Sequence, residues 1–168
     1  MRQFVTFKIE NQSFGIDIDA VREINQQVSI TPVPQAGNFV RGLVNLRGQI
    51  VTIIDLGVRL GLPPRDLSNT NHNVILKTEE ELAALGARQG GSSLKTCRDV
   101  AGLLVDEIGD VVEETEQMEP RPANVGSVES RFLQGVIKRQ DELLLILSLE
   151  EVLGEVNVGK AGDREIQA

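Results

Sequence analysis

The sequence carries one short unit twice. Residues Phe39–Gly61, FVRGLVNLRGQIVTIIDLGVRLG, align without a gap on residues Phe132–Gly154, FLQGVIKRQDELLLILSLEEVLG. The identical pairs are Phe39/Phe132, Gly42/Gly135, Ile53/Ile146, Leu56/Leu149, Leu60/Leu153 and Gly61/Gly154. Most of the remaining apolar positions stay apolar, so the chain is expected to fold into two similar halves.

Each copy of the unit has the pattern of a β-hairpin followed by a short helix. Residues 43–46 and 49–54 read as two strands, and Arg47-Gly48 lies at the turn, where Gly48 supplies a positive φ. The helix caps are Asp55 and Gly61 in the first copy and Ser148 and Gly154 in the second. Different residues with the same capping role indicate one shared backbone plan.

A second similarity extends the repeat toward the N-terminus of each copy. The strand pattern of Phe14–Asp19 returns in Ala101–Asp106, upstream of the second hairpin. Short strands at close spacing, with glycine at the turns, are typical of small closed barrels. We therefore predict an all-β fold of two small barrels packed together.

The predicted boundaries follow the repeat. The first barrel covers about residues 14–72 and the second about 73–154, and an exchange of terminal strands between them stays open. The strands at 73–77 and 100–105 are expected to lead into the second barrel.

Two segments fall outside the repeat. Thr78–Asp99 is predicted to be a loop insertion, in which Thr78-Glu-Glu-Glu81 is a capping box, Gly86 stops a short helix, and the remainder is mobile. Residues 155–168 are polar and are expected to fray as a tail.

Composition narrows the classes of partner. The net charge of −8 and the scattered Lys and Arg predict no binding to nucleic acid, and the chain has no Trp or Tyr for base stacking. The N-terminus lacks a signal pattern, and the longest apolar run, around Leu143–Leu147, is too short to cross a bilayer. A single cysteine, Cys97, fits a reducing compartment. We expect a cytoplasmic protein that does not insert into the membrane.

Few residues of the sequence could catalyse a reaction or bind a metal ion. His72 is the only histidine, so neither a histidine metal cluster nor a histidine base for Cys97 is expected. Asp17 and Asp19 alternate with Ile18 and are interpreted as the solvated face of a strand. The sequence therefore predicts no enzyme activity, cofactor or metal. A small-ligand-binding or hydrolytic barrel stays an alternative, and it would need a pocket with convergent polar groups.

Arg47 is the strongest candidate for a functional residue. It lies near a hairpin tip, where its planar fork of donors is exposed and suited to carboxylates or helix-end carbonyls of a partner. The tip Asn45–Gly48 is the part of the unit that the second copy, with Lys138–Asp141, does not preserve. The fold therefore does not need this tip sequence, and an ordinary solvated turn is the competing interpretation.

These residues resemble one family, the CheW-like coupling proteins of bacterial chemotaxis. The matching segments cover about residues 3–154, and they are Phe14–Ile18, Val21–Ile24, Phe39–Gly48, Ile50–Asp55, Ala101–Val112 and Phe132–Leu153. The resemblance implies two SH3-like five-stranded barrels around a shared core, without catalytic activity. It also implies a scaffold that links the regulatory domain of the histidine kinase CheA to the cytoplasmic tips of methyl-accepting receptors, in membrane-attached arrays.

The resemblance also implies partner-binding residues. Val21 and Glu23 match the family's coupling surface, with Ile24 beside them, and Gly42 and Arg47 match its motif glycine and arginine. A Glu23–Arg47 pair is expected from the family, and Asn45 joins the candidates because it belongs to the unpreserved tip. An adaptor of a non-flagellar chemosensory pathway would share this fold and differ in its partners.

Overall fold

The computed structural model consists mostly of strands, with a few short helices. It describes residues 2–26, 29–34, 37–64, 66, 71–89, 99–113, 118–120, 122, 124–125, 128–140 and 142–154. The elements are β1 (Gln3–Ile9), β2 (Gln12–Asp17), η1 (Ile18–Ala20), β3 (Val21–Gln26), β4 (Val40–Leu46), β5 (Gln49–Asp55), α1 (Leu56–Arg59), β6 (His72–Leu76), α2 (Glu79–Gln89), β7 (Ala101–Val105), β8 (Glu107–Glu113), β9 (Glu119–Pro120), β10 (Asn124–Val125), β11 (Val128–Glu129), η2 (Ser130–Phe132), β12 (Leu133–Arg139) and β13 (Glu142–Leu147). Residues 149–154 form a further helix. The predicted all-β fold with short helices is confirmed.

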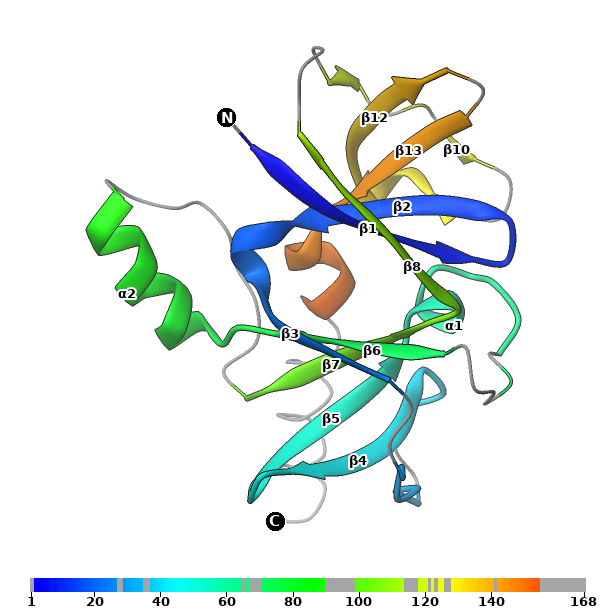
Figure 1. Cartoon of the computed structure of the whole chain (residues 1–168). Helices are drawn as coiled ribbons and strands as arrows, with labels where there is room; N and C mark the ends of the chain where they lie inside the picture. The colour runs from blue at the N-terminus through cyan, green and yellow to red at the C-terminus, as the bar shows by residue number, and fades with distance from the viewer. Residues whose placement is uncertain are drawn as a thin grey trace.

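Two large sheets with matching strand order make up the molecule (Figure 1). The central sheet has the order β3-β6-β7-β5-β4, and the terminal sheet has the order β8-β1-β2-β13-β12-β9. In the view of Figure 1 the terminal sheet lies above the central one. Read in order, β3 corresponds to β8, β6 to β1, β7 to β2, β5 to β13 and β4 to β12. The repeat in the sequence is therefore also a repeat in the structure.

Each hairpin is completed by a strand from the other half of the repeat. In the central sheet β5 pairs in parallel with β7, with Ile53 opposite Gly102. In the terminal sheet β13 pairs in parallel with β2, with Ile146 opposite Gly15. A Cβ at either glycine would lie 3.0 Å from the isoleucine Cδ1 opposite, so a larger residue at either position would need that isoleucine to shift.

The exchange places two strands that border the predicted division. The strands at 73–77 and 100–105, expected to lead into the second barrel, lie in the central sheet as β6 and β7. The division near residue 72 follows the sequence repeat, whereas the sheets exchange strands across it. Strand periodicity shows that a strand exists but not which of two equivalent hairpins it joins.

The core is shared between the halves. The largest apolar cluster combines β1 and β2 of the terminal sheet, through residues such as Phe7 and Phe14, with β6 and β7 of the central sheet, through Leu76 and Leu103. Smaller clusters fill the inside of each half, one around Ile53 in the central sheet and one containing Phe4 in the terminal sheet. Burial of this apolar surface holds the two sheets together.

The insertion forms the helix α2, which projects from the side of the molecule in Figure 1. Its predicted capping box is confirmed: the Thr78 backbone N–H donates to Glu81 Oε1 at 3.0 Å, and the Glu81 N–H donates to Thr78 Oγ1 at 3.3 Å. The predicted stop at Gly86 is wrong, because α2 continues to Gln89. Glycine inside a helix costs about 1 kcal/mol relative to alanine and does not by itself end it. The predicted mobile remainder, 90–98, and the tail lie outside the described residues.

Candidate functional site

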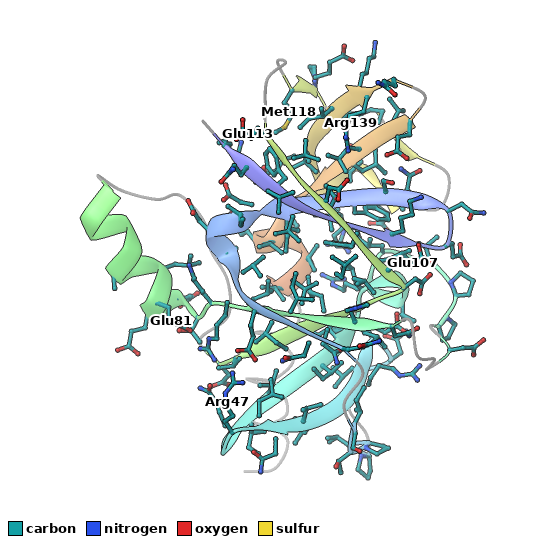
Figure 2. All side chains as sticks on the ribbon, in the orientation of Figure 1. Arg47, Glu81, Glu107, Glu113, Met118 and Arg139 are labelled. Atoms are coloured by element: carbon teal, nitrogen blue, oxygen red, sulfur yellow. The ribbon has the colours of Figure 1, made fainter. Side chains whose placement is uncertain are left out.

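The β4–β5 hairpin ends in a two-residue turn that carries Arg47. Both turn residues have positive φ, 51° at Arg47 and 86° at Gly48, as type I′ hairpins require. Asn45 Oδ1 accepts a hydrogen bond from the Gly48 backbone N–H at 2.9 Å, which fixes the turn. Asn45 therefore shapes the tip, and the Arg47 side chain is 72% exposed. Figure 2 shows Arg47 at the free end of this hairpin.

The positive φ of Arg47 follows from the turn type. Glu10 and Gln140, at the β1–β2 and β12–β13 turns, also have positive φ without being glycine. A non-glycine residue with positive φ thus recurs at the hairpin turns of this fold, so the strained backbone alone does not mark Arg47 as a functional residue. What distinguishes Arg47 is its side chain and the partner that this side chain finds.

That partner is Glu23, on β3 at the opposite edge of the central sheet. Arg47 Nη2 donates to Glu23 Oε2, and Asn25 Nδ2 donates to Glu23 Oε1 at 2.8 Å. The expected Glu23–Arg47 pair is therefore confirmed. Because Glu23 lies on β3 and Arg47 on the β4–β5 turn, the pair bridges the two edges of the sheet.

The local charges keep Glu23 ionised. Hydrogen bonds from Asn25 and Arg47 hold the pKa of the Glu23 carboxyl below its usual value, and the charges of Arg47 and Arg22 act in the same direction. At neutral pH the pair is therefore a fixed carboxylate and guanidinium. An exposed pair of this kind contributes about 0–1 kcal/mol to stability, so its main effect is on the shape and charge of the surface.

A β-bulge in β3 positions these side chains. The pairing with β6 shifts between Val21, opposite Leu76, and Glu23, opposite Ile75, which leaves Arg22 as the extra residue. Bulges re-aim side chains, and here both Arg22 and Glu23 reach the β4–β5 hairpin. The sequence pattern missed Arg22, because a bulge leaves no signature in the apolar alternation.

Arg22 connects the hairpin to the insertion. Its Nη1 donates to Gln49 Oε1 at 2.7 Å, and its Nε donates to Glu81 Oε2 at 3.3 Å. Burial works to raise the pKa of Glu81, but hydrogen bonds from Arg22 and Thr78 outweigh it and hold that pKa below its usual value. The ion pair therefore fastens the first turn of α2 to the edge of the central sheet.

The other sequence candidates divide between surface and interior. Ile24 is 38% exposed on β3, whereas Val21 is half-buried and packs against the shared core. We call Glu23 and Arg47, together with Asn45 at the turn and Ile24 next to Glu23 along β3, the hairpin-tip patch. Gly42 is buried and lies outside this patch.

Gly42 has a structural reason to be glycine. Its φ is +148°, and a Cβ there would lie 2.2 Å from the Thr31 carbonyl oxygen. At Gly135, its counterpart in the other half, a Cβ would lie 2.6 Å from the Glu119 carbonyl oxygen. Any effect of Gly42 on a partner would therefore act through the path of β4.

One buried arginine was not predicted at all. Arg59, on α1, donates from Nε to the Val152 carbonyl at 2.8 Å and from Nη2 to the Glu151 carbonyl at 2.9 Å. Its guanidinium also lies over the rings of Phe132 and Phe39, at 4.7 and 5.3 Å from their centroids. It therefore joins α1 to the corresponding helix of the other copy. The two phenylalanines are an identical pair of the repeat, which is the one signal the sequence offered.

The described residues show little else with catalytic or membrane character. Among them, no group of three or more His, Cys, Asp or Glu side chains is placed to hold a metal ion. No helix in the described part of the chain has the length and apolar character needed to cross a membrane. His72, the only histidine of the sequence, begins β6, where it lies opposite Gln26 and Val105.

Comparisons with known proteins agree on one family. The family model for the CheW-like domain matches residues 3–157. The probable chemotaxis protein CheW of Rhizobium etli is 30% identical over 155 residues, covering 92% of this chain and 88% of the relative. The chemotaxis protein CheW of Klebsiella aerogenes is 29% identical over 153 residues, covering 90% and 81%.

A solved structure extends the likeness to the fold. The crystal structure of the scaffolding protein TtCheW from Thermoanaerobacter tengcongensis matches with a TM-score of 0.72 at 27% sequence identity. The match covers 90% of this chain and 87% of that chain. It confirms the all-β fold class predicted from the repeat.

Proposed function

Because the chain belongs to the CheW-like family, we propose that it is an adaptor that couples methyl-accepting chemoreceptors to the histidine kinase CheA in bacterial chemotaxis. The observation that carries the proposal is the family match across residues 3–157, a range that contains the hairpin-tip patch. The named relatives are chemotaxis proteins, which favours chemotaxis over a non-flagellar chemosensory pathway.

The hairpin-tip patch supports a docking role. Ile24, the neighbour of Glu23 along β3, adds an exposed apolar side chain, and the Glu23–Arg47 pair supplies fixed charges of both signs. Charges around an apolar contact give specificity and orientation more than raw affinity. We place receptor and kinase contacts on this patch and on the adjoining strand β3, with Val21 and Gly42 supporting it from within.

The proposed mechanism is scaffolding without catalysis. The adaptor holds the regulatory domain of the kinase next to the helical tip of the receptor, so that ligand state at the receptor biases kinase activity. An amphipathic receptor helix laid in an apolar groove is the mode of recognition that suits such a tip. The adaptor would be cytoplasmic and recruited to membrane-attached arrays.

Binding of the purified chain to both partners tests this proposal. We expect it to co-sediment with receptor-bearing membranes and to bind the isolated regulatory domain of CheA. The membranes without receptor are the control for nonspecific adhesion. Binding to neither partner would contradict the proposal. A deep polar cavity with measurable hydrolytic turnover would favour the alternative of a hydrolytic barrel.

A further inference from the structure

The insertion is an addition that the fold does not need. In the terminal sheet, β1 and β2 are joined by the tight turn Glu10-Asn11. In the central sheet, the corresponding strands β6 and β7 are joined by α2 and the residues that follow it. Gly15 of β2 and Gly102 of β7 hold the same position in the two sheets. When the strands are aligned on these two glycines, residues 79–98 take the place of that tight turn. One half of the molecule thus shows the minimal connection, and the other carries an extra element there.

A groove lies between this extra element and the β4–β5 hairpin. It has a volume of about 640 Å³, within the range of cavities that hold a small ligand or a few side chains. The residues that line it come from β3, the hairpin and both ends of the insertion. They are Arg22, Leu43, Gln49, Ile50, Thr52, Thr78, Glu80, Glu81, Asp99 and Val100.

The β4–β5 hairpin forms the floor of the groove, which presents apolar side chains and is open to solvent. Ile50 is 57% exposed, the largest value among the exposed large apolar residues of the described chain. Leu43 lies on the same outer face of the hairpin, because it pairs with Thr52, and Thr52 alternates with the inward-facing Val51 and Ile53. An apolar side chain of a partner has a ready contact here.

The wall of the groove is acidic. Glu80 is exposed on the first turn of α2, and Glu81 and Asp99 stand beside it. Among the described residues of the lining, the one guanidinium, that of Arg22, is paired with Glu81 and bonded to Gln49. Glu80 therefore gives this described part of the lining a negative charge, which complements a lysine or arginine of a partner.

The edge of the sheet favours a helix over an added strand. Pairing of an extended peptide along β4 would need its free edge, but Thr31 already exchanges two backbone hydrogen bonds of 2.8 Å with Leu43. A helix needs no backbone pairing and inserts side chains from one face. Arg22 also makes the groove continuous with the hairpin-tip patch, since it neighbours Glu23.

We propose that this groove is an accessory docking site for an α-helix of the receptor, which sets an apolar side chain against Ile50 and a basic side chain against Glu80. The inference rests on the proposed function, which assigns both a receptor and a kinase as partners. We choose the receptor because the groove suits a helix and the receptor tip is the helical partner. It gives the insertion a role in partner choice: a chain with a tight turn at this position has the hairpin but lacks the acidic wall.

Affinity for a receptor cytoplasmic fragment tests the apolar floor. Ile50→Ser should weaken binding about tenfold, because it removes the apolar contact at the groove. Leu143→Ser is the matched control: Leu143 holds the corresponding position in the terminal sheet and is 45% exposed. It should bind within about twofold of the wild type.

The same assay tests the acidic wall. Glu80→Lys should weaken binding several-fold, and more at low ionic strength, because salt screens exposed charges. Glu107→Lys makes the same change of charge at an exposed site, which lies on the opposite side of the molecule from Glu81 in Figure 2. This variant should bind like the wild type. Replacing residues 79–98 by Asn-Gly should reproduce the losses, with the β-sheet circular dichroism signal retained.

The outcomes separate this inference from the proposed function. If Ile50→Ser and Glu80→Lys bind the receptor fragment like the wild type, the groove is not a docking site, while the adaptor function stands. Weakened binding to the CheA domain alone, or a loss of self-association alone, would overturn the inference by assigning the groove another occupant. A wild-type chain that binds neither partner would overturn both.

Discussion

At the scale of single residues, the central sheet contains one buried polar side chain whose amide is not satisfied. Asn73 is 1% exposed, and neither its Nδ2 nor its Oδ1 has a hydrogen-bond partner. The corresponding position of the terminal sheet is Phe4, which is fully buried in the apolar cluster of that half. The repeat therefore shows that the site accepts an apolar side chain.

Asn73→Val should stabilise the protein by about 1–2 kcal/mol, because it removes an unsatisfied amide from the interior. Chemical denaturation of the two proteins measures this difference. Asn71→Val is the contrasting variant: Asn71 is also buried, but its Nδ2 donates to the Asp66 carbonyl at 2.8 Å. That variant should be less stable, and equal effects at the two sites would contradict the account.

Glu23 gives the stability a specific pH dependence. Its folded-state pKa is lowered from 4.5, by Asn25 and Arg47 first, so its stabilising contribution is present above that value and is lost as the pH falls through the lowered pKa. Glu23→Gln should therefore lose less stability than the wild type between pH 7 and pH 3. Thermal unfolding across this range tests it, and curves that run parallel would show that the pair does not form in solution.

At the scale of elements, the β4–β5 hairpin depends on two glycines for different reasons. Gly42 is pressed against the Thr31 backbone, whereas a Cβ at Gly48 would meet no atom within 4 Å. Both have positive φ. Gly42 is therefore needed both because the space is too small for a side chain and because its φ is positive. Gly48 is needed only because its φ is positive.

Gly42→Ala should cost about 3 kcal/mol or more, since it adds a steric clash to a strained φ. Gly48→Ala should cost only about 1–2 kcal/mol. Urea denaturation midpoints of the two variants provide the comparison. A Gly48 variant as unstable as the Gly42 variant would mean that the turn is packed against something else.

The elements also show what the sequence could predict. The hairpins, the cap at Asp55 and the capping box at Thr78 were predicted correctly, because each depends on a few neighbouring residues. The helix end at Gly86 was wrong, because a glycine permits a stop without requiring one. The bulge that brings Arg22 to the β4–β5 hairpin was missed, because it depends on how β3 registers against β6.

At the scale of the whole molecule, the repeat predicted two similar halves and left open whether they exchange strands. Both β2 and β7 carry the same pattern, so the sequence cannot distinguish pairing with the nearer hairpin from pairing with the farther one. The structure selects the farther hairpin in both cases. The Glu23–Arg47 pair came from family resemblance, since periodicity alone does not bring β3 and the β4–β5 turn together.

Arg59 tests whether the two halves are fastened through their helices. Arg59→Ala should lower stability by about 3 kcal/mol or more, because it leaves helix-end carbonyls of the other half without this donor. Arg131, whose guanidinium lies 4.3 Å from the Phe132 centroid but is exposed, is the control, and Arg131→Ala should cost no more than about 1 kcal/mol. If calorimetry shows similar losses of stability for the two variants, the effect of Arg59 would come from its contact with the Phe132 ring.

The most direct measurement of the central claim is the affinity of Arg47→Glu for a receptor cytoplasmic fragment. We expect a loss of about tenfold or more with a nearly unchanged melting temperature, because Arg47 is exposed and its ion pair adds little stability. Gln140→Glu, at the positive-φ turn of the other half, should bind like the wild type. Unchanged affinity of the Arg47 variant, or equal losses in both, would contradict a docking role for the hairpin-tip patch.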